Sequence, residues 1–350
     1  MNQKEINTKT AQEVLSGPFW AEPVFPKYYA EEFAMESPCS PPGLPNYFDT
    51  WESERCFEWL NRTVLTWDVQ QEGFFPTPDE NMFWAMGIVQ GRVVWGVDEG
   101  FFRSRYFIRL EFTEGKISFL KAWVDSLAFL RAANLPIPPI KSDFFDPRID
   151  EFIRNTPPRY KLKGPDRGAD PYEGVDMSED VVRQRMLDNL GQNNCGVERE
   201  KFRRLENFHP EYQRGAYFLP VSNPYLKVSD YEKSVRNNRR EKKNPEDTMP
   251  EEIKPRSFAN TKVSSPWMYR DTRGKNYPTD DPHVWFAEML SNGPCCWLGN
   301  HFERGHYHQK YLMYLVFDDA GRELVRDEII NPQYKYSSCN IPLPSFPYYA

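Results

Sequence analysis

The residues best suited to acid–base chemistry lie near the end of the sequence. Glu328 lies near the middle of the predicted strand 324–330, and a carboxyl group inside an apolar pocket has its charged form disfavoured. Its pKa then rises toward neutrality, where it can both donate and accept a proton. His306 and His308 are two residues apart and share one face of an extended strand. We predict Glu328, His306 and His308 as catalytic candidates, with one histidine assisting the acid.

The same residues permit other interpretations. Two histidines and one carboxylate form a known metal-binding set, and two nearby histidines also occur as a plain surface pair. We predict no metal at these residues. Arg326 is two residues before Glu328 and shares its face, so it could neutralise the acid or hold a substrate carboxylate. Asn331 is predicted to cap or orient the end of the strand.

Two segments of the chain share one layout, which predicts an internal repeat. One runs from Gly100 to Pro138 and the other from Gly305 to Pro344. Each contains a long alternating strand, a turn glycine (Gly115 or Gly321) and a further strand, as expected of a hairpin. Residues 83–87 and 285–289 are predicted to begin matching strands upstream.

Helical patterns precede each set of strands. Residues 51–67 place apolar side chains near one face, and residues 181–190 and 198–208 also read as helices. The apolar face of the first helix is formed by Cys56, Trp59, Leu60, Thr63 and Trp67. The fold class is therefore α+β, with helices on one side of each antiparallel sheet. We predict a first domain over 1–141, a linker over 142–180, and a second domain over 181–350 with an insertion near 228–256.

Composition excludes several classes of function. A formal net charge of −7 argues against nucleic-acid binding. The absence of a long apolar run or an apolar leader predicts a cytoplasmic protein that does not enter a membrane. The 6 cysteines contain no C-x-x-C pair and are interpreted as reduced thiols. No phosphate-binding glycine loop occurs, so no cofactor is predicted.

The sequence resembles a known family over 50–140 and 260–350. GRELVRDEIINP, which contains Glu328, and EWLNRTVLTWDV, which contains Trp59, are similar to segments of the phenazine-biosynthesis A/B proteins. These belong to the nuclear-transport-factor-2-like, or SnoaL-like, superfamily. The resemblance implies two tandem cone-shaped rolls, each a curved sheet around helices with an internal pocket. In the first half, Ala122 stands where the family has its strand glutamate.

The resemblance also implies roles for individual residues. Glu328 would point into the pocket as the acid/base of a condensation of aminocyclohexenone molecules. Tyr311 and Tyr106 occupy a pocket-facing family position, although either could be plain core. The pocket histidine of the family has no counterpart here, because Trp59 and a position near Ala259 replace it.

The first half is interpreted as a degenerate partner of the second. It would supply a dimer-like interface and walls such as Trp59, Trp84 and Trp123, although aromatic residues so spaced are more often core. Tyr106, Tyr311, Arg326, Asn331 and Trp59 are the predicted substrate-binding residues.

The resemblance implies an enzyme of secondary metabolism, and the absence of a cofactor motif predicts that it is cofactor-free. It would condense, cyclise or isomerise a small amino or keto intermediate of a phenazine-like, nitrogen-containing product. The alternatives are a cyclase or dehydratase acting by shape, and a non-catalytic ligand-binding or scaffold protein. The predicted partners are the small molecule and the intrachain pseudo-dimer, with a homodimer also possible.

Overall fold

The computed structural model describes two sheet-containing domains and a short C-terminal tail. The described residues are 2–21, 24–25, 27–96, 98–138, 172, 174–191, 208–218, 275–294, 306–330, 333, 336 and 342–348. Most of the predicted linker, nearly all of the predicted helix at 198–208, the insertion near 228–256 and Asn331 lie outside the described residues.

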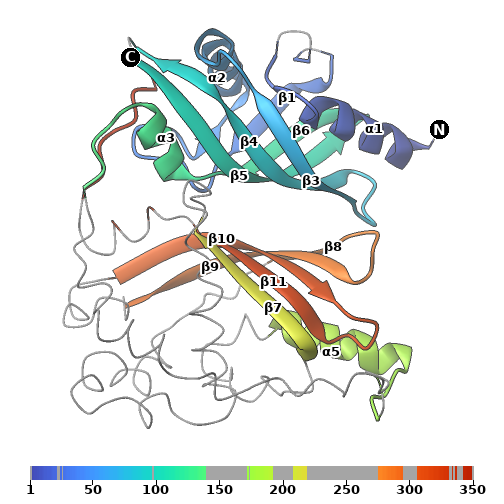
Figure 1. Ribbon diagram of the computed structural model, residues 1–350. Helices are drawn as coiled ribbons and strands as arrows, with labels where there is room; N and C mark the ends of the chain where they lie inside the picture. The colour runs from blue at the N-terminus through green and yellow to red at the C-terminus, as the bar shows by residue number, and fades with distance from the viewer. Residues whose placement is uncertain are drawn as a thin grey trace, which may run out of the picture.

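The first domain is a curved six-stranded sheet with three helices (Figure 1). The strand order is β2-β1-β6-β5-β4-β3, with antiparallel pairing except between β1 and β6. The helices are α1 (Gln3–Leu15), α2 (Thr50–Thr63) and α3 (Ser126–Ala132). The strands are β1 (Tyr29–Glu36), β2 (Tyr47–Phe48), β3 (Asp68–Pro76), β4 (Met82–Trp95), β5 (Asp98–Thr113) and β6 (Lys116–Trp123).

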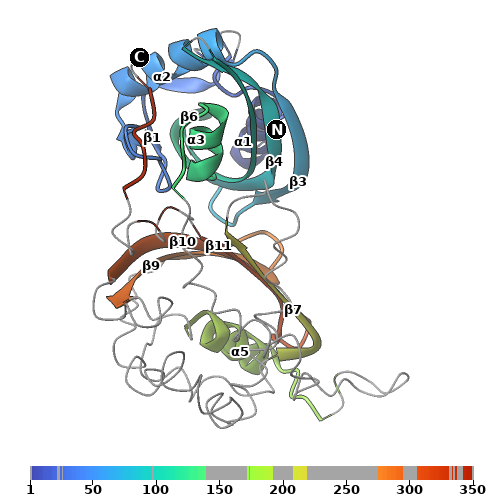
Figure 2. The same cartoon turned by 60° about the vertical axis from the view of Figure 1, so that its left-hand side comes forward.

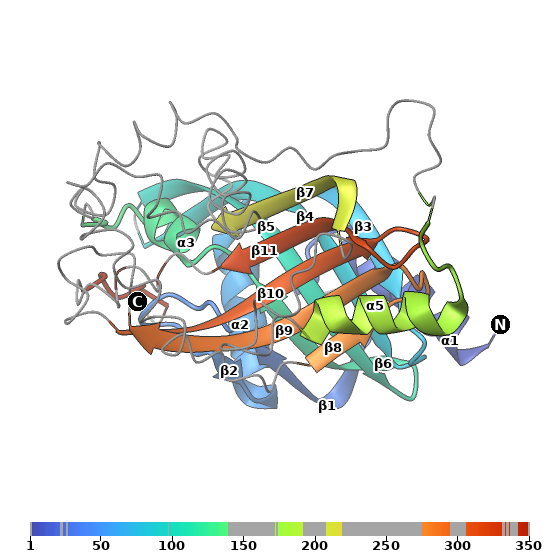
Figure 3. The same ribbon diagram turned by 90° about the horizontal axis from the view of Figure 1, so that it is seen from below.

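The second domain has a five-stranded sheet in the order β7-β11-β10-β9-β8. Its elements are α5 (Glu179–Gly191), β7 (Phe208–Phe218), β8 (Lys275–Pro278), β9 (Val284–Pro294), β10 (His306–Phe317) and β11 (Glu323–Ile330). Helix α5 covers one face of this sheet (Figure 3), where Met186 and Leu190 pack against Met313 and Leu315. The predicted α+β class, with helices against curved sheets, is confirmed.

Equivalent strands pair in the same register in the two sheets. Ile108 in β5 pairs with Ala122 in β6, and Met313 in β10 pairs with Glu328 in β11. In both sheets the last hairpin strand also pairs in parallel with an earlier strand, β1 or β7. Residue 328 therefore occupies the register position that Ala122 occupies in the first domain.

The predicted hairpin glycines are confirmed as turns. Gly115 and Gly321 have φ values of +79° and +72°, a left-handed conformation that favours glycine. Space is also limited at the second turn, because a Cβ atom on Gly321 would lie 2.4 Å from the carbonyl oxygen of Val182 in α5. The glycine therefore lets the hairpin approach the helix that covers its sheet.

Some elements were absent from the sequence-based prediction. The parallel strands β1 and β7 convert each expected antiparallel meander into a mixed sheet. Helix α1 begins with a capping box, in which Asn2 accepts from the backbone of Glu5 and the Glu5 side chain accepts from the backbone of Asn2. In the part of the chain that the structure describes, no helix is long and apolar enough to cross a bilayer.

The two domains pack sheet against sheet (Figures 1 and 2). Trp84 in β4 stacks on Phe286 in β9, with ring centroids 4.5 Å apart and planes at 3°. The two residues hold equivalent positions in the repeat, so they meet as residues do at the axis of a symmetric dimer. The surrounding apolar cluster contains Cys39, Met86, Phe107, Trp123, Tyr277 and Leu312. The two sheets thus form a closely packed interface within the chain.

Charged side chains complete the interface. The Arg109 guanidinium donates to the Tyr277 hydroxyl at 2.6 Å and to Glu288 at 2.5 Å. The Lys121 ammonium lies 2.8 Å from Glu288 and 3.1 Å from Glu36. Arg109 and Lys121 are both buried, and each has a second carboxylate partner: Glu111 lies 2.7 Å from Arg109, and Glu36 contacts Lys121. Removing Glu288 would leave two buried cations with one shared anion fewer. Arg109 therefore links the domains.

Replacing Trp84 by alanine tests the importance of the stacked pair. The side chain is fully buried, and truncating a buried tryptophan costs about 3–5 kcal/mol. We expect Trp84→Ala to lower the free energy of unfolding by that amount in urea denaturation. Trp51→Ala is the matched control, because Trp51 is 60% exposed. Equal effects of the two changes would contradict a central role for the interface.

Candidate functional site

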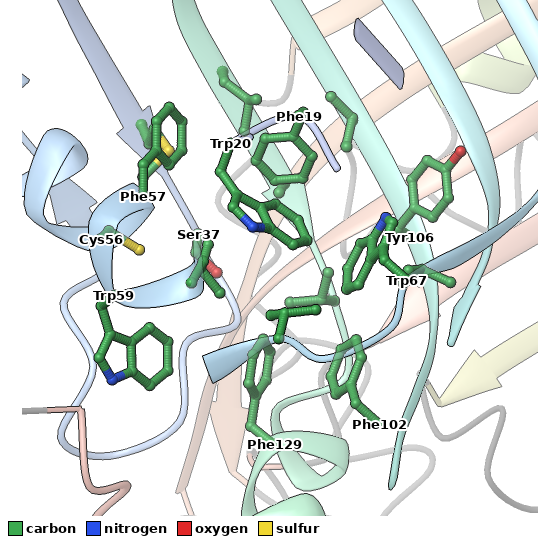
Figure 4. A pocket seen from close by; sticks show the side chains of 18 of the residues that line it. Phe19, Trp20, Ser37, Cys56, Phe57, Trp59, Trp67, Phe102, Tyr106 and Phe129 are labelled. Atoms are coloured by element: carbon green, nitrogen blue, oxygen red, sulfur yellow. The ribbon is translucent and has the colours of Figure 1, made fainter. Parts of the chain in front are cut away.

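A cavity of about 140 Å³ lies in the first domain, inside the curve of its sheet (Figure 4). Helix α2, strands β4 to β6 and the segment after α1 form its wall. Most lining side chains are aromatic or aliphatic: Leu15, Phe19, Trp20, Met35, Leu44, Phe48, Phe57, Trp59, Leu60, Val64, Trp67, Val69, Val89, Val93, Trp95, Phe102, Ile108, Leu120, Ala122, Val124 and Phe129. Gly17, Glu36, Ser37, Cys56 and Tyr106 complete the lining.

Helix α2 contributes part of the face that the sequence predicted, because the helix ends at Thr63 and Trp67 follows it. Asp49 begins the helix by accepting a hydrogen bond from the Glu52 backbone at 2.9 Å. Cys56, Trp59 and Leu60 then line the cavity, as the predicted apolar face requires. The Trp59 indole stacks on Trp95 from β4, with centroids 5.0 Å apart. Helix and sheet thus hold this wall together through two large rings.

Alternating residues of β5 and β6 form the opposite wall. Tyr106 and Ile108 come from β5, while Leu120 and Ala122 come from β6. Alternation along a strand explains why every second residue faces the same side. The small Ala122 side chain leaves space at the position that corresponds to Glu328. The acid expected from the family is therefore replaced by a methyl group in this cavity.

The cavity is suited to a small neutral ring. An apolar cavity of about 150 Å³ in another protein stays dry and binds benzene. The only carboxylate among the described lining residues, Glu36, lies 3.1 Å from the Lys121 ammonium. The cavity can therefore hold a single six-membered ring without an ionic group.

Tyr106 presents a neutral phenol at the cavity wall. Its hydroxyl donates to the Gln71 side chain at 2.6 Å, and the Gln71 amide donates to the Met86 carbonyl at 2.7 Å. Burial raises the pKa of Tyr106 above its ordinary value, an effect partly opposed by the hydrogen bond to Gln71. Tyr106 therefore contributes shape and a fixed dipole at neutral pH.

Asp125 lies at the junction of β6 and α3, next to cavity-lining Val124. Its carboxylate accepts from the Leu127 backbone at 2.9 Å, and its own N–H donates to the Ser104 hydroxyl at 2.9 Å. Burial raises the pKa of Asp125 to about 7, although Arg131 opposes this shift. Its second oxygen has no hydrogen-bond partner among the described residues. This residue caps the helix that carries Phe129, and capping is also the role predicted for Asn331.

The predicted residues of the second domain are placed at the level of the backbone. Glu328 and Arg326 lie in β11, while His306, His308 and Tyr311 lie in β10. Strand positions alternate between the faces of a sheet. The position of Glu328 pairs with Met313, whose side chain packs toward α5.

The two histidines and Glu328 occupy strand positions of opposite parity, so they belong to different faces of the sheet. His306 and His308 are an even number of residues from Leu312, which packs toward the first domain. In a regular sheet the register therefore assigns Glu328 and the two histidines to opposite faces. The catalytic and binding roles of all these residues stay predictions.

Two predicted cavity walls lie elsewhere. Trp84 and Trp123 stack on each other at 5.7 Å within the interface between the domains, because their strand positions face away from α2. Trp59 and Tyr106 do line the cavity. Trp20, Phe57 and Phe102 also line the cavity and were not predicted from the sequence. The aromatic residues of 19–67 were the available signal, but Trp20 and Phe57 lie outside the predicted helix face.

The described residues contain no cluster of three or more potential metal ligands. Cys39 and Cys56 are both buried. Burial raises the pKa of the Cys56 thiol to about 12, an effect that a hydrogen bond with Tyr348 partly offsets.

Comparison with known families identifies a relationship within the first domain. The sequence model described as Phenazine biosynthesis protein A/B matches residues 42–146. Phenazine biosynthesis protein PhzA1 of Pseudomonas aeruginosa is 31% identical over 103 residues, which cover 29% of this chain and 64% of that protein. PhzB1 of the same organism is 27% identical over 86 residues, covering 24% and 53%. The chain thus spans less than two thirds of the length of these relatives.

Solved structures show more distant similarity. A phenazine biosynthesis-related protein (phzb2) from Pseudomonas aeruginosa has a TM-score of 0.35 at 20% identity, covering 40% of this chain and 92% of that chain. A putative SnoaL-like polyketide cyclase from Jannaschia sp. CCS1 has a TM-score of 0.31 at 14% identity, covering 38% and 94%. The resemblance to the phenazine biosynthesis A/B proteins is confirmed by the sequence match in the first domain. The predicted second copy of the domain is supported by strand pairing that matches that of the first sheet.

Asp125→Asn tests the buried acid. In the folded protein the pKa of Asp125 is raised from its ordinary value of 3.8 to about 7, so folding favours the protonated side chain. The stability that this carboxyl group contributes is therefore fully present below pH 3.8 and is lost as the pH rises to about 7. Asparagine also caps helices but does not ionise. We expect the variant to be more stable than the unchanged protein by more than about 1 kcal/mol at pH 8. Thermal unfolding across pH 4–8 measures this, and parallel pH profiles for both proteins would contradict it.

Proposed function

We propose that the chain acts in the biosynthesis of a small nitrogen-containing ring compound of phenazine type. In this proposal the cavity of the first domain holds a neutral one-ring intermediate. Glu328 of the second domain supplies acid–base catalysis for a condensation, cyclisation or isomerisation. The observation that carries the proposal is the shared register, since Glu328 is equivalent in position to cavity-lining Ala122.

The first part of the proposal is supported by the shape of the cavity and the family relationship. The relatives matched over the first domain are named as phenazine biosynthesis proteins. A cavity lined by indole and phenyl rings binds flat molecules through their faces and edges. Burial of most of the surface of a one-ring ligand would provide the affinity, and the few polar groups would fix its orientation.

The second part is supported by the position of residue 328. Its partner Met313 is fully buried and packs toward α5, which covers that sheet as α2 covers the first one. Burial among apolar side chains disfavours the charged form of a carboxyl group, which is the condition that acid–base catalysis near neutral pH requires. Tyr311, Arg326 and Asn331 are the proposed substrate-binding residues around it.

A second candidate function is binding or shape-driven cyclisation without an acid. The apolar lining of the first cavity and the presence of Ala122 favour it. In that case the two domains would bind ligands, and proton transfer would not require Glu328. The two candidates differ in the expected effect of changing Glu328 alone.

Ala122→Phe tests ligand binding in the first domain. A benzyl group at this position would fill a cavity that holds about one ring, so affinity for 3-aminocyclohex-2-enone should fall by more than about tenfold. Tryptophan fluorescence titration or calorimetry measures the affinity. Ala30→Phe is the matched control, because Ala30 lies in β1 and does not line the cavity. Unchanged affinity in Ala122→Phe would assign the ligand to another site.

Glu328→Gln tests the acid–base role. General acid–base catalysis contributes about 10²–10⁴-fold, so condensation of the same amino ketone, followed by mass spectrometry, should slow by that range. Binding in the first domain should be retained. Glu31→Gln changes an exposed carboxylate and serves as the control. Full turnover in Glu328→Gln would exclude Glu328 as the acid–base catalyst and would favour the shape-driven function.

His308→Gln, measured in the same turnover assay, tests whether this histidine assists Glu328. Because the register assigns His308 and Glu328 to opposite faces, we expect this variant to keep most of its turnover. An equal loss in His308→Gln and Glu328→Gln would show that the acid and the histidine act as a pair.

A further inference from the structure

The tail formed by residues 342–348 follows the second domain in sequence but packs on the first. Figure 2 shows the red end of the chain beside α2, away from the sheet of the second domain. Phe346 and Tyr348 are each only 3% exposed and belong to the apolar core of the first domain. The first domain is therefore completed by a segment from the other end of the chain.

The tail contacts the side chains that form the cavity wall. The Phe346 ring meets Trp95 at 5.0 Å, Phe129 at 5.7 Å and Trp59 at 5.9 Å, each edge to face. The Tyr348 ring meets Trp59 at 5.1 Å and Phe48 at 6.2 Å. All four contacted residues line the cavity. The tail thus holds this wall in place from its outer side.

Few backbone hydrogen bonds hold the tail. Pro342, Pro344 and Pro347 have no N–H to donate. Among the described residues, the backbone bond from the tail to the first domain is Phe346 N–H to the Pro42 carbonyl, at 2.5 Å. The attachment therefore depends mainly on the two aromatic rings. Segments with few backbone hydrogen bonds are the first to open in local unfolding.

The wall behind the tail also limits the size of the ligand. With the tail in place, the cavity of about 140 Å³ suits one ring. If Phe346 and Tyr348 left, Trp59 and Trp95 would lose packing on their outer side and could turn outward. The cavity would then join the space vacated by two aromatic side chains.

We infer that residues 342–348 form a removable wall of the first-domain cavity, with Phe346 as the residue that limits ligand size. The closed wall admits one-ring molecules, and its displacement admits fused two- or three-ring molecules. The size limit rests on the proposed ligand-binding function. The opening of the wall does not, since it follows from the packing of the tail.

Opening is tested through the reactivity of Cys56. This thiol lines the cavity, is hydrogen-bonded with Tyr348 and has its pKa raised to about 12 by burial, so it should react slowly while the wall is closed. In Phe346→Leu, we expect modification of the Cys56 peptide by N-ethylmaleimide to accelerate by more than about tenfold, as followed by mass spectrometry. Phe112→Leu is the matched control, because Phe112 is buried in the same core but does not line the cavity.

Size selection is tested with two ligands on the same variants. Phe346→Leu should raise the affinity for phenazine relative to 3-aminocyclohex-2-enone by more than about tenfold, while Phe112→Leu leaves the ratio unchanged. Equal Cys56 labelling in the two variants would overturn the removable wall. Faster labelling in Phe346→Leu without binding of either ligand would support the wall and count against the proposed function. Faster labelling with an unchanged affinity ratio would overturn the size limit.

Discussion

The packing of one sheet face against the other determines which face of each sheet can enclose a cavity. Trp84 and Phe286 stack at the centre of this contact and bury the convex faces of both sheets. Only the concave face of each sheet remains for an internal space, and α2 or α5 covers that face. The cavity of the first domain therefore lies on the side away from the interface. The chemistry of a strand residue depends on which face it occupies, since neighbouring residues such as Lys121 and Ala122 differ completely in role.

The interface also keeps the cavity almost free of charge. Glu36 lies at the cavity wall, but its carboxylate is directed to Lys121, which in turn contacts Glu288 of the second domain. Charged groups are thus gathered on one side of the sheet and rings on the other. An uncharged cavity can hold a flat molecule without the cost of removing ions from water. This division of the sheet gives the first domain a cavity that is suited to a neutral ligand.

The sequence was sufficient to predict the α+β class, the two hairpins and the helix face that carries Cys56 and Trp59. These predictions depend on local signals: a turn glycine, alternation along a strand and helical spacing. The parallel strands β1 and β7 were missed because their pairing joins residues distant in sequence, and alternation cannot reveal a partner. Trp84 was predicted as a possible cavity wall because both faces of its strand are apolar. The sequence alone cannot tell which of the two faces meets the cavity and which meets the other sheet. The position of Phe346 could not be predicted, because no local pattern indicates that a tail will pack on the other domain.

The ion pairs of the interface also bear on which surfaces can associate. Arg109 and Lys121 both meet Glu288, whereas the equivalent position in the first domain is Met86. Two copies of the first domain, joined through this same face, would bring two arginines and two lysines together without that glutamate. The desolvation of these cations would oppose such self-association. Glu111 and Glu36 of the first domain would still contact these cations, but the glutamate that joins them across the interface would be missing. The charge pattern therefore favours pairing of the first domain with the second, which is the pairing that the single chain also imposes.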